Sequence, residues 1–256
     1  MNSVQRVYSA INKEEADQVP RGEFWLDSSL LSKMFPQEKK FTLSDEVLAL
    51  KILGIDLRAF CPKSNKDNDV AKVQPAIPHI DQSSKYIFSN PKISDYEEIA
   101  LWRKETDFFL FAMLDGVFQG VASLLDFNTF LMATVNDGSK LVKLIEGQSA
   151  YIIEQAKLAV AAGAHGILLA EDMAYNRGLY ISPQSLRKLF FPGLKEVVQT
   201  IKKELDVPIF LHSDGNISAI LEDIVAMGFD GMQGIESGAG MDLLEIKKQY
   251  RPELEG

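Results

Sequence analysis

Cysteine is almost absent from this chain of 256 residues, which contains only Cys61. A single thiol excludes an internal disulfide and a Cys-rich zinc site, and it is typical of proteins in a reducing compartment. The N-terminal segment MNSVQRVYSAINKEEADQVP also lacks the apolar run of a secretory signal. We therefore expect a cytoplasmic protein.

A surplus of basic residues is missing as well, because 27 Lys and Arg stand against 36 Asp and Glu, a formal net charge of −9. Surfaces that bind nucleic acids or anionic membranes concentrate Lys and Arg. The sequence has no such cluster, so we expect neither partner. Asp115 and Asp126 interrupt the most apolar stretch, FFLFAMLDGVFQGVASLLD, which leaves less than the ~18 apolar residues of a membrane span.

Glycine-rich nucleotide-binding motifs are also absent from the sequence. Neither G-x-G-x-x-G nor G-x-x-x-x-G-K-[ST] follows an apolar run, which removes the usual support for an open nucleotide-binding sheet. Short β-branched or aromatic runs instead alternate with segments of helical period, and this order predicts a parallel sheet. The predicted strands are 22–27, 55–60, 107–114, 166–172, 207–214 and 230–236. The predicted helices are 43–54 with Ser44 as its cap, 139–162, a helix from Ser182 that Pro192 kinks or breaks, 217–227 and 241–250.

Polar or acidic residues recur where these strands end, at Asp27, Asp172, His212, Asp214 and Glu236. In a (β/α)8 barrel all the carboxyl ends of the strands meet in one mouth, and this mouth carries the chemistry of barrel enzymes. We therefore predict an α/β protein of the (β/α)8 TIM-barrel class rather than an open doubly wound sheet.

Six strands fall short of the eight in such a barrel. Two missing strands would expose apolar sheet edges, so the sequence predicts a barrel truncated at its C-terminus, with about six of eight βα units present and roughly 80 residues lacking. Residues 1–256 are predicted to form a single domain. The polar, proline-rich stretch at about 62–91 is expected to be a long excursion or a small hairpin.

The segment VPIFLHSDGN, 207–216, carries the main candidate site. Side chains alternate along a strand, so His212 and Asp214 point into the barrel together while Ser213 points away. An imidazole and a carboxylate at this spacing can bind one divalent ion, act as an acid/base pair, or form a hydrogen bond of structural value alone. Gly215 lets the backbone turn sharply after them, and we count it among the candidate substrate contacts.

The segment EDMAYNRGLYISP, 171–183, supplies further candidates. Only one of its two adjacent acids can face inward from a strand, and Asp172 is the candidate catalytic residue. Tyr175, Arg177 and Tyr180 follow on a loop over the mouth. Each of these three is a candidate substrate contact or a plain loop residue.

Glu236 ends the strand within GIESGAGMD, 234–242. It is either a third metal donor beside His212 and Asp214 or a solvated surface acid. The other two histidines, His79 and His165, are predicted to be structural, because His165 precedes a strand at the end of the barrel that is opposite to the mouth.

The segments EDMAYNRGLYISPQSLRKLFFPGLK and PIFLHSDGNISAILEDIVAMGFDGMQGIESGAGMDLLEIKKQY resemble the uroporphyrinogen decarboxylase superfamily. They are most similar to its corrinoid-dependent branch, the methylcobamide:coenzyme M type of methyltransferase. The resemblance covers 107–250 and, more loosely, EEADQVPRGEFWLD. It implies a (β/α)8 barrel whose last two strands would follow residue 256. It also implies an enzyme that moves a methyl group between a corrinoid (methylcobalamin), carried by a small corrinoid-binding protein, and a small-molecule acceptor.

The methyltransferase branch reads H-x-C-G where this chain reads HSDG. In that branch the His and the Cys bind zinc, which activates an incoming thiol. Here His212 and Gly215 match the motif, whereas Asp214 replaces the cysteine. An oxygen ligand can bind zinc but makes a harder site, so coenzyme M, tetrahydrofolate and a metal-free transfer all stay open.

A uroporphyrinogen decarboxylase, a carboxy-lyase of porphyrin biosynthesis, is the alternative within the same superfamily. Its R-Q-A-G-R loop binds the carboxylates of the tetrapyrrole, but the corresponding RGEFWLDSSLLSKM contains Arg21 alone, which disfavours a polyanionic substrate. A non-catalytic corrinoid- or tetrapyrrole-binding barrel is the third alternative.

Overall fold

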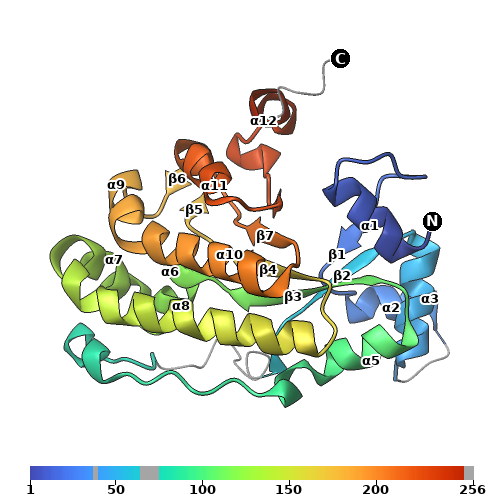
Figure 1. Ribbon diagram of the computed structural model, residues 1–256, viewed down its shortest axis with the longest axis horizontal. Helices are drawn as coiled ribbons and strands as arrows, with labels where there is room; N and C mark the ends of the chain where they lie inside the picture. The colour runs from blue at the N-terminus through green and yellow to red at the C-terminus, as the bar shows by residue number, and fades with distance from the viewer. Residues whose placement is uncertain (37–39, 64–74, 251–256) are drawn as a thin grey trace.

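A curled parallel sheet is the scaffold of the protein (Figure 1). The computed structural model describes residues 1–36, 40–63 and 75–250, and in this part of the chain six parallel strands pair in the order β1-β2-β3-β4-β7-β8. The curl makes a half-barrel, which confirms the predicted barrel class. The strands are β1 (Gly22–Glu23), β2 (Leu57–Phe60), β3 (Phe109–Asp115), β4 (Gly166–Ala170), β7 (Ile209–His212) and β8 (Gly231–Gln233).

The register of the sheet sorts its side chains onto two faces. Partners across the ladder point the same way, and successive residues of a strand point to opposite faces. Met113, Leu168 and Phe210 are paired across β3, β4 and β7 and lie on the concave face, where they belong to one apolar cluster. The next row is fully buried on the convex face and consists of Leu114, Leu169 and Leu211.

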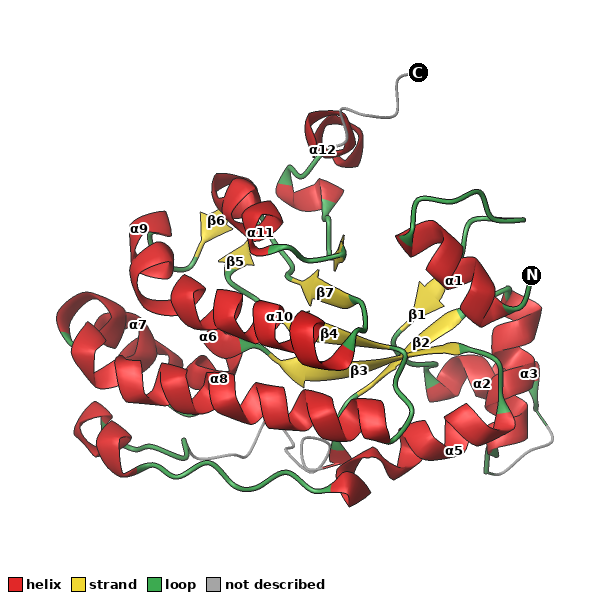
Figure 2. Cartoon of the chain, viewed as in Figure 1, coloured by secondary structure: helices red, strands yellow, loops and turns green. Residues whose placement is uncertain are grey.

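Helices cover the convex face (Figure 2). Three of them, α5 (Glu97–Glu105), α8 (Gly138–Ala161) and α10 (Phe191–Leu205), pack directly on β3 or β7. Burial of each large apolar side chain in this layer contributes about 1.5–3 kcal/mol. Further helices of the described chain are α2 (Ser28–Met34), α3 (Leu43–Leu53), α6 (Val117–Ser123), α7 (Phe127–Asn136), α9 (Pro183–Ser185), α11 (Leu221–Met227) and α12 (Leu243–Tyr250).

Helix α1 (Ser3–Ile11) lies on the other side, against the concave face. Val7 is buried in the concave cluster, and the ring of Tyr8 meets Phe109 edge-on with 5.2 Å between centroids. Phe109 starts β3, so α1 covers the N-terminal end of the concave face. The polar strand ends lie at the opposite, carboxyl end.

Capping residues set where the helices begin. Ser182 caps α9 through a 3.1 Å hydrogen bond from the Ser185 N–H, with Pro183 at the first helical position, as predicted. Near Pro192, where a kink or a break was expected, the helix changes type: a π-helical segment (Leu186–Phe190) immediately precedes α10. The prediction of Ser44 as the cap of α3 is wrong, because Thr42 accepts the capping hydrogen bond and forms a reciprocal capping box.

The predicted excursion at 62–91 is only partly described, since 64–74 lie outside the described residues. In its described portions, 62–63 and 75–91, a short 3-10 helix (Ile80–Lys85) is present and no strand is, so the hairpin alternative gains no support there. None of the described helices has the length and apolarity that a membrane crossing requires. A short antiparallel pair, β5 (Ala174–Tyr175) and β6 (Gly178–Leu179), stands apart from the main sheet.

Candidate active site

One row of side chains lies level across the carboxyl ends of four strands. Asp115 of β3 pairs with Ala170 of β4, Ala170 pairs with His212 of β7, and His212 pairs with Gln233 of β8. This row lies two residues beyond the concave apolar row that includes Phe210. A polar mouth therefore stands over an apolar floor on the concave side of the sheet.

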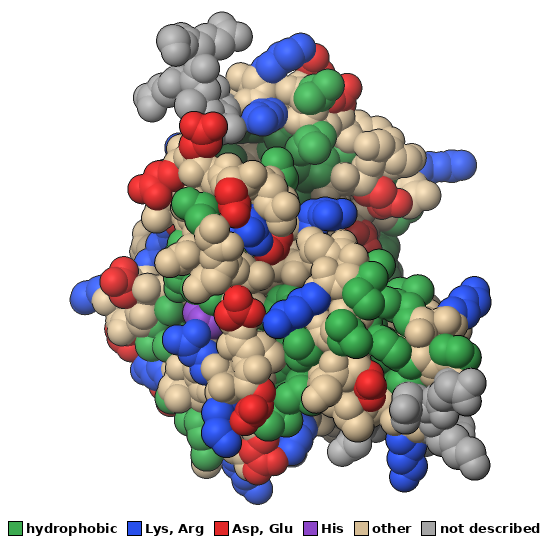
Figure 3. Space-filling model, turned by 90° about the vertical axis from the view of Figure 1, so that its right-hand side faces the viewer, with side chains coloured by type: hydrophobic (Ala, Val, Ile, Leu, Met, Phe, Trp, Pro, Cys, Tyr) green, Lys and Arg blue, Asp and Glu red, His purple; other side chains and the backbone are tan. Residues whose placement is uncertain are grey.

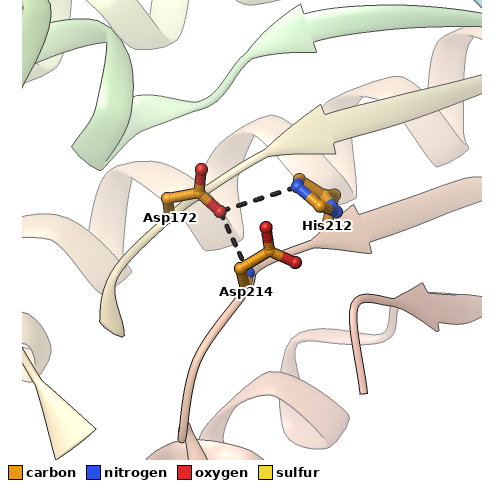
Figure 4. A group of neighbouring side chains, drawn as sticks. All are labelled: Asp172, His212 and Asp214. Carbon is orange, nitrogen blue, oxygen red and sulfur yellow. Dashed lines mark hydrogen bonds and ion pairs between the residues drawn. The ribbon is translucent and has the colours of Figure 1, made fainter. Parts of the chain in front are cut away.

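Asp172, His212 and Asp214 form the central cluster of this mouth (Figure 4). His212 Nε2 lies 3.6 Å from Asp172 Oδ1. The same Asp172 oxygen accepts a 3.0 Å hydrogen bond from the Asp214 backbone N–H. One potential ligand atom from each of the three side chains lies within 4.8 Å of the others. The structure thus brings together the three residues named from the sequence as candidate catalytic residues.

Gln233 and Phe24 contact the His212 ring, and sequence reasoning missed both residues. His212 Nδ1 contacts Gln233 Oε1, and since an amide oxygen can only accept, this contact fits the tautomer with the hydrogen on Nδ1; Nε2 faces Asp172. Phe24 directly follows β1 and meets the imidazole edge-on, with 5.6 Å between centroids. Only the register of β8 against β7 places Gln233 level with His212, and a single sequence does not specify that register.

Glu171 points in the opposite direction from its neighbour Asp172. It is 0% exposed, in the convex layer. Its carboxylate accepts hydrogen bonds from the backbone N–H groups of Val117, Phe118 and Gln119 at the start of α6. Burial raises the pKa of Glu171 to about 8, and these three donors oppose the rise. The prediction that only one of the two adjacent acids faces the mouth therefore agrees with the geometry.

Asp115 adds a third acid to the mouth, at the end of β3. Burial raises the pKa of its carboxyl, and the charge of Asp172 raises it further. Sequence reasoning treated Asp115 only as an interruption of an apolar run. The signal that identifies it is the one applied to the other strands, an acid at the carboxyl end.

Glu236 supports the turn after β7 and is not part of the converging cluster. Its Oε2 accepts a 3.1 Å hydrogen bond from the Gly215 N–H, and its role as a metal ligand stays a prediction. Gly215 has φ +79°, and a Cβ atom there would lie 2.7 Å from the backbone nitrogen of Tyr175. Only glycine fits at this turn.

The β5–β6 hairpin lies beside the mouth. Tyr175 and Tyr180 are 47% and 38% exposed, and their rings stack with 5.7 Å between centroids. Arg177 is exposed in the turn between the two strands. The Asn216 N–H donates a 3.0 Å hydrogen bond to the Tyr175 carbonyl, which ties the hairpin to the segment after β7. Substrate contact by Tyr175, Arg177, Tyr180 and Gly215 stays a prediction.

The central cluster fits a divalent ion. Imidazole nitrogen and carboxylate oxygen are ligands that zinc and related ions accept at about 2.0–2.2 Å, so ligands of one ion lie about 3–4 Å apart. The 3.6 Å between His212 Nε2 and Asp172 Oδ1 matches that separation. The contact of Gln233 at Nδ1 is the kind of support that metal-bound histidines have.

Comparison with known proteins identifies a family match and a solved structure with the same fold. A model of the uroporphyrinogen decarboxylase (URO-D) family matches residues 69–251. None of the curated proteins matches the chain. A solved methyltransferase from Methanosarcina mazei superposes with a TM-score of 0.72 at 18% identity, covering 91% of this chain and 75% of that one. Similarity at this level of identity shows a common fold.

Two further solved structures give weaker superpositions. A B12-independent methionine synthase from Shewanella sp. W3-18-1, in complex with selenomethionine, has a TM-score of 0.44 at 16% identity, with 71% of this chain and 53% of that chain covered. A putative vitamin-B12 independent methionine synthase from Listeria monocytogenes has a TM-score of 0.48 at 11% identity, with coverage of 83% and 70%.

Proposed function

Since the chain belongs to the uroporphyrinogen decarboxylase family, we propose that it is a methyltransferase that moves a methyl group between a corrinoid on a small partner protein and a small acceptor. The acceptor would bind at the cluster of Asp172, His212 and Asp214. The observation that carries this proposal is the orientation of His212, whose Nε2 faces Asp172 at 3.6 Å in a polar mouth. The fold shared with the Methanosarcina methyltransferase supports it.

In this proposal His212 is the general base. Because its Nδ1–H is directed at Gln233, the Nε2 lone pair is free to accept the proton of an S–H or N–H group on the acceptor. The electron pair released on the acceptor forms the new bond to the methyl carbon. The electrons of the broken bond leave with the methyl donor. The carboxylate of Asp172 stabilises the imidazolium that results.

Asp172, His212 and Asp214 are also the residues that would hold a divalent ion. When bound, such an ion would supply Lewis acidity that lowers the pKa of the acceptor S–H or N–H. Asp214 stands where a softer thiolate would bind zinc, and a site built from one nitrogen and two carboxylates is harder. We therefore include the nitrogen of tetrahydrofolate beside the thiol of coenzyme M as a candidate methyl acceptor.

The arginines argue against a polycarboxylate tetrapyrrole as the substrate. Arg21 precedes β1, with its guanidinium beside Gly54, at the opposite end of the sheet from the mouth. Arg177 is exposed in the turn of the hairpin beside the mouth. Four others pair elsewhere with acids or with His165, namely Arg6, Arg58, Arg103 and Arg187. A substrate with several carboxylates would need more guanidinium groups.

Acidic and basic groups are also mixed on the outer surface. Figure 3 shows the face on the right-hand side of Figure 1, and on its described part Lys and Arg are interspersed with Asp and Glu without gathering into a basic patch. The expectation that the protein binds neither nucleic acids nor an anionic membrane stays a prediction.

Demethylation of methylcobalamin, followed by the absorbance of the cobalamin, tests the proposal. Coenzyme M and tetrahydrofolate are supplied separately as acceptors to the 256-residue chain. We expect turnover with at least one of them, and we expect His212→Ala to lower kcat by about 10²–10⁴-fold. His79→Ala is the matched control, because His79 is an exposed histidine outside the mouth, and it should retain the wild-type rate.

Three results would contradict the proposal. The first is no turnover with either acceptor; if cobalamin still binds, this result would favour the non-catalytic barrel. The second is an equal rate for His212→Ala and the wild type. The third is the loss of carboxylates from uroporphyrinogen, which would favour the decarboxylase.

A further inference from the structure

A hydrogen-bond path connects the buried Glu171 to the cluster in the mouth. Glu171 Oε2 accepts bonds from the backbone N–H groups of Phe118 at 2.9 Å and Gln119 at 3.2 Å. The side chain of Gln119 turns back toward β4, and its Oε1 accepts a 3.0 Å hydrogen bond from the Asp172 N–H. Helix α6 is therefore joined to residues 171 and 172 by both the backbone and the side chain of Gln119.

Gly116 allows this close approach of the loop before α6 to the end of β4. A Cβ atom at Gly116 would lie 2.2 Å from Glu171 Cδ. The Gly116 N–H donates a 2.7 Å hydrogen bond to the carbonyl of Ala170, the last residue of β4. The start of α6 thus lies directly beneath the strand end that carries Asp172.

We propose that Gln119 is a positioning residue that holds Asp172 in register with His212, and that Glu171 fixes Gln119 by anchoring the start of α6. The side chain of Asp172 is 40% exposed, so packing alone does not fix it. The hydrogen bond to its N–H sets the direction from which its carboxylate reaches His212 and Asp214. The catalytic consequence rests on the proposed function, whereas the positioning itself is measured independently.

Gln119→Met separates the two links of the path. It removes the side-chain oxygen that Asp172 uses, keeps a side chain of similar length, and leaves the backbone N–H that bonds Glu171. Hydrogen exchange followed by NMR then reports on Asp214, whose N–H donates to Asp172 Oδ1 at 3.0 Å. We expect the Asp214 amide to exchange about three- to tenfold faster, the equivalent of one hydrogen bond.

Two comparisons separate positioning from general loosening of the fold. Gln199→Met makes the same substitution at an exposed position of α10 and should leave the exchange of Asp214 unchanged. In Gln119→Met, amides of β3 that do not touch Asp172, such as Leu110, should keep their wild-type protection. Equal Asp214 exchange in Gln119→Met and the wild type would overturn the proposal, and so would acceleration shared equally with Leu110.

Titration with Co²⁺ alone gives a second readout, by calorimetry, because the cluster offers ligands from Asp172, His212 and Asp214. Loss of a residue that supports a metal ligand costs about 10- to 100-fold in affinity, and we expect a loss near the lower figure for Gln119→Met. Faster Asp214 exchange with unchanged Co²⁺ affinity would overturn the functional part of the inference. A wild type that binds no Co²⁺ would count against the metal in the proposed function, and the exchange rates would then decide the role of Gln119.

Discussion

Acidification should destabilise the protein through His165, a histidine far from the mouth in the fold. His165 is 7% exposed, and its Nδ1 accepts a 3.0 Å hydrogen bond from the Leu110 N–H. Its ring stacks on Phe109 with 5.1 Å between centroids, and the guanidinium of Arg103 faces Nε2. Burial, reinforced by the charge of Arg103, lowers the pKa of His165 from 6.5 to about 4.

The direction of the effect follows from which state binds the proton more readily. Between pH 6.5 and about 4 the ring of His165 is protonated in the unfolded chain but neutral in the folded protein. The unfolded state therefore binds more protons, and stability falls as the pH falls through this interval. One pKa unit corresponds to about 1.4 kcal/mol. Protonation of His165 should thus remove up to about 3 kcal/mol from the free energy of unfolding.

Urea denaturation at a series of pH values from 7 to 4 measures this loss. His165→Asn retains an acceptor for the Leu110 N–H but does not titrate, so its stability should fall by up to about 3 kcal/mol less than that of the wild type over the same interval. His79→Asn is the control, because His79 is exposed and should follow the wild-type curve. Parallel curves for His165→Asn and the wild type would refute the reasoning.

Two substitutions at the mouth give further predictions. Gly215→Ala should destabilise the fold by about 2–4 kcal/mol in thermal denaturation, because the backbone is left-handed there and a Cβ would lie 2.7 Å from the Tyr175 nitrogen; a wild-type Tm would contradict this. Gln233→Leu should lower kcat or Co²⁺ affinity by about 10- to 100-fold, because it releases His212 Nδ1. Since Gln233 is exposed, Tm should change little, and unchanged kcat and affinity would show that the imidazole is oriented by other contacts.

The sequence predicted the sheet well because its signals are local. An apolar run such as 107–114 predicts a strand whose two faces are covered, and β3 has this character. Strand ends were less well placed: the predicted strand at 22–27 is only two residues long as β1. Strand length depends on pairing with the neighbour, and β1 pairs with β2 over Gly22 and Glu23 alone. A single sequence does not contain that information.

The cluster of Asp172, His212 and Asp214 could be predicted because its sequence signals are also local. The residues that surround the cluster could not be predicted. Alternation within one strand is enough to place His212 and Asp214 together, and the convergence of parallel strand ends adds Asp172. Contacts between strands depend on register, so the position of Gln233 beside the imidazole required the structure. Gln119 was missed because it acts from a helix through the backbone of Asp172, a contact without a sequence pattern.

If the proposed methyl transfer takes place at the mouth, its charge affects which acceptor can bind there. Asp115, Asp172 and Asp214 place three carboxyl groups around one imidazole, and the charge of Asp172 already raises the pKa of Asp115. A small acceptor that carries a negative charge near its reacting atom would meet repulsion there, which is strengthened because the mouth lies over an apolar floor. The sulfonate of coenzyme M lies close to its thiol, whereas the reacting nitrogen of tetrahydrofolate is distant from that molecule's carboxylates. The electrostatics therefore favour the pterin over the thiol unless a bound cation offsets the acids, so the preferred acceptor should shift toward coenzyme M when Co²⁺ is added.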